Sequence, residues 1–224
     1  MPLDLPPKNK CLPSDATKIE KTLRSIVAYE PAATSTYQFY EVIDAWLGPW
    51  GDAGYPIGYG KKYNIEFNKN PYLNSYDHPI STRWVRLTTV NLQTAIIGYV
   101  VAQVKAGKLS AVTERALREA AFASHPAAYR NAGLEDVAVN EVESLFWIFA
   151  IPIEEFNPTK SSFKATITQV VDVVQEPGLS VWLYDLAKGT SKWPIRTLEA
   201  KLGDLVRFLE SGIKDLYGYP GHFY

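Results

Sequence analysis

The stretch VNLQTAIIGYVVAQV (90–104) is the most apolar run in the chain, and it constrains the fold more than any other feature. Two glutamines and a threonine interrupt it, and arginines precede it, so it is too short and too polar to cross a bilayer. We therefore interpret it as part of a long buried helix, which Ser81 can cap and which ends at Gly107. No transmembrane segment is expected.

The composition is that of an ordinary folded domain. Hydrophobic residues make up 46% and charged residues 21% of 224 positions, so a sizeable core can form. The net charge of −1 gives no global attraction to nucleic acid, and no nucleic-acid partner is expected. The chain starts without the apolar segment of a signal peptide. We expect synthesis in the cytoplasm, with any delivery outside the cell by a non-classical route.

Prolines and capping residues divide the chain into segments. Four of the 15 prolines fall in residues 1–13, which predicts an extended N-terminal arm before a single, mainly helical domain at 14–224. Besides the long apolar helix, the first 130 residues contain signals for three more helices. These are expected at about 15–30, 36–47 and 110–124, with the last one ended by Pro126.

The second half of the chain gives weaker signals. Residues 140–175 contain short apolar runs that suit a helix or a strand. Apolar residues at steps of three and four predict a final helix over 195–216. Its apolar stripe would either dock on the core or form an oligomer seam, and the oligomeric state stays open.

One segment departs from the helical pattern. Residues 44–64 contain five glycines, and KKYNIEF (61–67) alternates as a short strand does. We expect a small β element near 50–67, within an aromatic, glycine-rich lobe at about 48–80, so the fold class is mainly α (α+β). Flat rings stack on the apolar faces of sugars, and their polar edges bond to hydroxyl groups. The candidate substrate-binding rings are Trp46, Trp50, Tyr55, Tyr59 and Tyr63.

FYEVID (39–44), followed by GYPIGYGK (54–61), resembles the active-site opening of the phage-type lysozymes, which hydrolyse peptidoglycan. In that family a helical glutamate precedes a small hairpin with an acidic residue and a T-I-G-[YI]-G-H turn. Glu41 lies 16 positions before Ile57, which is the family's spacing, whereas Lys61 stands at the family's histidine. The resemblance implies a lysozyme-like fold in which Glu41 is a general acid kept protonated by apolar surroundings. Asp52 or Asp44 would then position or activate water.

Two functions of different class follow. The resemblance implies a glycoside hydrolase acting on peptidoglycan or a related polysaccharide, as a delivered antibacterial effector that a protein inhibitor could block. The alternative is a non-enzymatic binding or assembly protein, with the aromatic loop and the C-terminal helix as contact surfaces. Under that alternative, Glu41 is a solvated helix residue.

Other chemistry has few candidate residues. Cys11 is the only cysteine, which excludes an intrachain disulfide, and the three histidines lack metal-ligand spacing. No metal and no cofactor is expected. The pairs His78–Pro79 and His125–Pro126 are interpreted as helix ends, where an imidazole meets backbone carbonyls.

Overall fold

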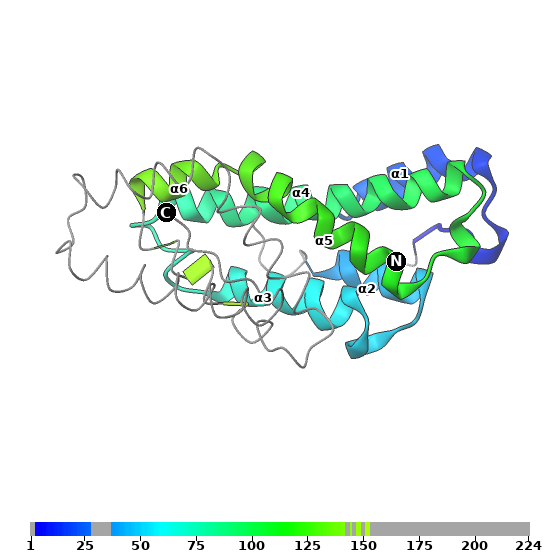
Figure 1. Cartoon of the computed structure of the whole chain (residues 1–224), viewed down its shortest axis with the longest axis horizontal. Helices are drawn as coiled ribbons and strands as arrows, with labels where there is room; N and C mark the ends of the chain where they lie inside the picture. Colours follow the sequence, from blue (N-terminus) through cyan, green and yellow to red (C-terminus); the bar gives the residue numbers. More distant parts are fainter. Residues whose placement is uncertain (1–2, 28–36, 142–143, 145–146, 149–150, 153–224) are drawn as a thin grey trace, which may run out of the picture. The chain divides into compact units, whose positions relative to one another are not determined.

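The structure is a computed structural model, which describes residues 3–27, 37–141, 144, 147–148 and 151–152. The chain divides into a first unit that ends at Leu134 and a second that begins at Glu135, and each is described by itself. Every regular element in the described ranges is helical and none is a strand (Figure 1). The expectation of a mainly helical fold is therefore confirmed.

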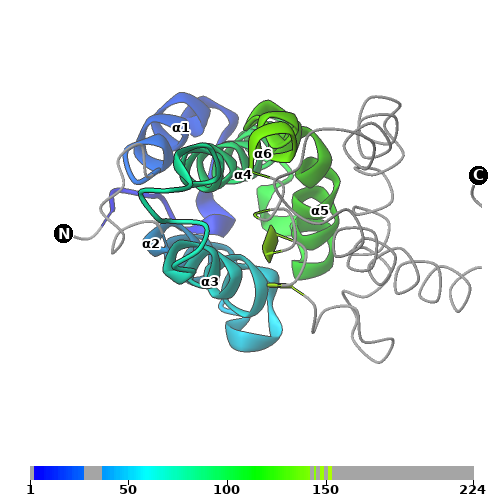
Figure 2. The ribbon, with the colours of Figure 1, turned by 90° about the vertical axis from the view of Figure 1, so that its left-hand side faces the viewer.

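Five α-helices of the described chain lie in the first unit. The longest, α4, packs against both α1 and α5, while α2 and α3 lie below α4 in both views (Figures 1 and 2). Large side chains from all five helices fill the core between them, among them Leu23, Phe39, Tyr63, Trp84 and Leu117. The helices are α1 (Ala16–Arg24), α2 (Gln38–Leu47), α3 (Lys62–Lys69), α4 (Pro79–Lys105) and α5 (Glu114–Asn131).

Helix α4 contains the apolar run that the sequence analysis placed in a buried helix. It begins at Pro79, so Ser81 lies inside its first turn, buried, with its hydroxyl donating to the carbonyl of His78. Gly107 follows the helix with a φ of +65°, a left-handed conformation that glycine adopts without a steric penalty. Among the described residues, α4 alone has the length and hydropathy of a membrane-spanning helix, and 44% of its most apolar 18-residue window is buried within the protein.

The prediction of a β element near 50–67 is wrong. A 3-10 turn (Gly51–Ala53) leads into a π-helix, η4 (Pro56–Lys61), which continues directly into α3. Pro56 opens η4, where a helix needs no N–H donor from that residue. The aromatic residues Tyr55, Tyr59, Tyr63 and Phe67 recur every four positions, and this helical spacing prevails over the alternation within 61–67.

Two other helix boundaries differ from the prediction. Helix α5 does not stop before Pro126 but runs through it to Asn131, and Thr113 caps its start by accepting a hydrogen bond from the backbone N–H of Ala116. Near the start of the unit, α1 ends at Arg24, before the predicted end at about residue 30, and residues 28–36 lie outside the described residues. Gly48 ends α2 as predicted.

The predicted N-terminal arm and the start of the second unit both contain helical turns. The arm contains short 3-10 turns at Lys8–Lys10 and Pro13–Asp15. Helix α6 (Leu134–Asn140) begins at the last residue of the first unit and continues into the second. Most of 140–175 and the whole helix predicted at 195–216 lie outside the described residues.

Candidate functional site

Glu41 lies on the surface of α2. Its side chain is 44% exposed, and its Oε1 accepts a hydrogen bond of 2.6 Å from Lys61 Nζ. The hydrogen bond and the charge of Glu41 raise the pKa of Lys61 above its usual value, and Tyr37 adds to this effect. The Lys61 ammonium also lies 5.3 Å from the centroid of the Tyr37 ring. Glu41 therefore meets a cation at the solvent boundary, not the apolar surroundings that a protonated general acid needs.

The ammonium group of Lys61 interacts electrostatically with two of the three candidate acids, Glu41 and Asp52. Asp52 is exposed on the turn Gly51–Ala53, and its charge also contributes to the raised pKa of Lys61. The carboxylates of Glu41 and Asp52 thus act on one ammonium group at the surface. In the sequence, Lys61 counts only as a departure from the lysozyme pattern, so the sequence analysis did not select it as a site residue.

Asp44, the third candidate acid, is buried and engaged with the backbone. Its Oδ1 accepts hydrogen bonds from the N–H of Trp50 at 3.1 Å and of Gly51 at 3.2 Å. These two donors belong to the turn that follows α2, where Gly51 has a φ of +62°. A carboxylate that accepts two backbone N–H groups ties this turn to the helix. Asp44 therefore has a structural role in the described chain.

Substituting Asp44 tests this role. We expect Asp44→Ala to lower the free energy of unfolding by about 1–2 kcal/mol, because both N–H donors lose their acceptor. Asp44→Asn keeps one acceptor oxygen, so its loss should be about half as large. Urea denaturation followed by circular dichroism measures both values. Equal stability of Asp44→Ala and the wild type would contradict the role.

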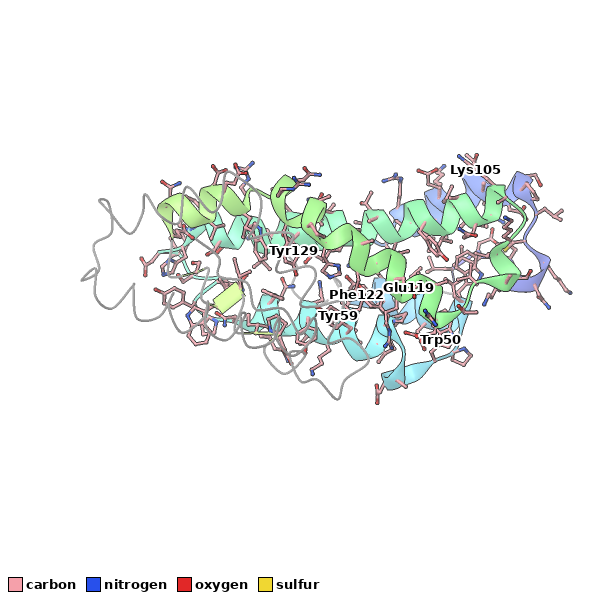
Figure 3. All side chains as sticks on the ribbon, viewed as in Figure 1. Trp50, Tyr59, Lys105, Glu119, Phe122 and Tyr129 are labelled. Carbon is pink, nitrogen blue, oxygen red and sulfur yellow. The ribbon has the colours of Figure 1, made fainter. Side chains whose placement is uncertain are left out.

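The tyrosines selected as sugar-stacking rings point into the core instead. Tyr55 and Tyr63 are buried, and the Tyr59 centroid lies 4.6 Å from that of Tyr63 and 4.7 Å from that of Phe122 on α5. Figure 3 shows Tyr59, from η4, and Phe122, from α5, beside one another. Because these rings contact one another and Phe122 in edge-to-face and stacked geometries, they stabilise the packing of η4 and α3 against α5.

The two tryptophans contact the N-terminal arm. Trp46 Nε1 donates a hydrogen bond of 2.7 Å to the carbonyl oxygen of Pro6. The ring of Trp50 has the ammonium group of Lys8 above it, 5.7 Å from the centroid. All five rings proposed for saccharide binding therefore make contacts within the first unit.

His125 is a buried titratable group that sequence analysis placed at a helix end. It lies inside α5, where its Nδ1 donates to the carbonyl of Ala121 at 2.8 Å. Pro126 has no backbone N–H and cannot donate to the carbonyl of Phe122. The His125 imidazole also hydrogen-bonds to the backbone of Phe122. Burial among aromatic rings lowers the pKa of His125 to about 4, although these hydrogen bonds oppose the shift. The imidazole does meet backbone carbonyls, but within the helix.

The loop between α3 and α4 presents a different kind of surface. Tyr76 is fully exposed at this loop. Asn70 Oδ1 accepts from the backbone N–H of Leu73 at 3.0 Å, and Asn74 Nδ2 donates to the carbonyl of Phe67 at 2.7 Å. The Thr82 hydroxyl donates to the carbonyl of Leu73 at 3.0 Å and to that of His78 at 2.9 Å. Side chains therefore fix the backbone on both sides of an exposed aromatic ring.

Neither a metal site nor a known relative assigns a function to these residues. Within the described ranges, no three side chains of histidine, cysteine, aspartate or glutamate gather where they could hold a metal ion. No protein-family model, curated protein or solved structure matches the chain.

Proposed function

We propose that the chain is a non-enzymatic binding or assembly protein that recognises a protein partner. The observation that carries this proposal is Tyr76, which is fully exposed on a loop whose backbone is fixed by Asn70, Asn74 and Thr82. Tyrosine is enriched among the residues that dominate protein–protein binding energy. A loop that is already ordered loses little conformational entropy when it binds.

The positions of the candidate catalytic groups also favour a binding role. Glu41 is ion-paired at the surface, and Asp44 holds the turn after α2. The aromatic side chains that would stack on a sugar contact the core or the N-terminal arm. This leaves the exposed loop, in place of the predicted aromatic loop, as the contact surface that we propose.

Substituting Tyr76 tests the proposal. Proteins captured by the wild type should be identified, and the purified partner titrated by calorimetry against wild type, Tyr76→Ala and Leu12→Ala. Leu12 is a matched control because it is also an exposed large apolar residue, on a different surface segment. We expect Tyr76→Ala to weaken binding about 30-fold or more, as truncation of a dominant contact residue does. An unchanged dissociation constant for Tyr76→Ala would contradict the proposal.

A lysozyme-like glycoside hydrolase is the second candidate, and one observation favours it. Glu41 and Asp52, the two acids that the resemblance selects first, both act on Lys61 and so lie at one surface site. The test measures loss of turbidity of a peptidoglycan suspension with wild type, Glu41→Gln and Glu119→Gln. Glu119 is the matched control because it is also an exposed acid paired with a cation, Arg115. Clearing by the wild type and Glu119→Gln, but not by Glu41→Gln, would favour the hydrolase; no clearing by the wild type would remove it.

A further inference from the structure

Lys8 holds the N-terminal arm against the first unit through its ammonium group. Its Nζ donates hydrogen bonds to the carbonyl oxygens of Leu47 at 2.8 Å and Val112 at 2.7 Å. The same group lies 5.7 Å from the centroid of the Trp50 ring. A protonated lysine has three N–H donors, and two carbonyls with one ring face provide partners for all three.

These acceptors form a cation-binding site that contains no carboxylate. Leu47 is the last residue of α2, so its carbonyl has no donor within the helix and lies at the negative end of the helix dipole. Val112 precedes α5, and its carbonyl comes from a separate part of the chain. No ion pair between Lys8 and an acid occurs among the described residues. Neutral acceptors at fixed positions select a group with N–H donors, not merely a positive charge.

We infer that the carbonyls of Leu47 and Val112 and the ring of Trp50 form a binding site for a protonated primary amine, which Lys8 occupies in cis. The hydrogen bond from Trp46 Nε1 to the Pro6 carbonyl holds the arm next to this site. Residues 3–13 therefore act as an intramolecular ligand. When the arm leaves, the site is open to the lysine side chain of another protein chain.

Cys11 provides the readout, because it is the only cysteine and lies on the same arm. Its thiol is half-buried, and burial raises its pKa, which slows its reaction with a disulfide reagent. Release of the arm should therefore increase the rate. We expect Lys8→Ala to raise the rate of thiol modification about tenfold, because two charge-assisted hydrogen bonds no longer oppose local opening.

Added amines then test the site itself. n-Propylammonium supplies three carbon atoms and an ammonium group, as many as Lys8→Ala removes. We expect it to return the rate of Lys8→Ala at least halfway to the wild-type value. Tetramethylammonium, which has no N–H donor, should leave that rate unchanged at equal ionic strength. In the matched control Lys8→Met, an apolar side chain fills the space of the lysine stem, so n-propylammonium should have no effect.

Two results of the thiol experiment would overturn the inference: wild-type reactivity of Cys11 in Lys8→Ala, or an equal effect of n-propylammonium on Lys8→Ala and Lys8→Met. A measurement on the wild-type chain tests the inference even if a variant fails to fold. In the wild type, nitrogen-detected NMR should show the ammonium protons of Lys8 exchanging with water at least tenfold more slowly than those of Lys10, which is exposed on the same turn. Equal exchange rates would also overturn the inference.

Discussion

Gly60→Ala should lower the free energy of unfolding by about 3 kcal/mol, near the upper end of the usual cost of overpacking. A Cβ atom at position 60 would overlap the ring of Tyr40, which is buried in α2. The Tyr40 ring cannot move aside easily, because the Phe39 ring lies edge-on to it with centroids 5.5 Å apart. The π-helix would therefore have to move away from α2, and the aromatic contacts of η4 would weaken with it.

The matched control is Gly98→Ala. Gly98 is exposed on α4, and a Cβ atom there would have no atom within 4 Å. Alanine forms helices better than glycine, so this substitution should raise the free energy of unfolding by about 0.5–1 kcal/mol. Urea denaturation of both variants gives the comparison. If Gly60→Ala were as stable as Gly98→Ala, the close packing of η4 on α2 would be wrong.

His125 should make the protein lose about 3 kcal/mol of stability between pH 6.5 and pH 4. Burial lowers the pKa of this imidazole in the folded chain to about 4, whereas in the unfolded chain it is near 6.5. Below pH 6.5 the unfolded chain binds a proton that the folded chain does not, so the equilibrium shifts towards unfolding as pH falls. The contribution is complete above pH 6.5 and is lost as pH approaches 4.

The measurement compares denaturation at pH 7.5 and pH 4.5 for wild type, His125→Asn and Gly98→Ala. The side-chain amide introduced by His125→Asn can still donate to the Ala121 carbonyl but does not titrate. The loss of stability of this variant over the pH range should be smaller than that of the wild type by about 2–3 kcal/mol. The control Gly98→Ala changes no titratable group and should keep the wild-type loss. Parallel pH profiles for wild type and His125→Asn would contradict the burial of His125.

The sequence predicted the elements whose signals are local. The apolar run at 90–104 lies in α4, Gly107 ends that helix region, and Gly48 ends α2. The region 50–67 was predicted wrongly because a seven-residue alternation was given more weight than the four-residue spacing of Tyr55, Tyr59, Tyr63 and Phe67. Helix α5 continues through Pro126, and the His125 side chain hydrogen-bonds to the backbone of Phe122, whose carbonyl receives no donor from Pro126.

The candidate site was less accessible to sequence analysis, because its chemistry depends on contacts between distant positions. Spacing placed Glu41 before the glycine-rich segment but gave no sign of its ion pair with Lys61, 20 residues away. The acceptors of Lys8 lie 39 and 104 residues along the chain, at Leu47 and Val112. A burial pattern could have suggested His125, since Leu117, Phe122 and Ala128 fall on its side of the helix.

The π-helix also restricts the number of residues that this segment can contain. In an α-helix, residues four apart point about 40° away from each other, so rings at that spacing would spiral around the axis. The wider turn at Pro56–Lys61 offsets this drift and keeps Tyr55 and Tyr59 in line with Tyr63. Deleting one residue here would rotate everything downstream by about 100° and turn the α3 rings away from α5. Insertions and deletions between 55 and 62 should therefore be selected against more strongly than substitutions at the exposed positions nearby.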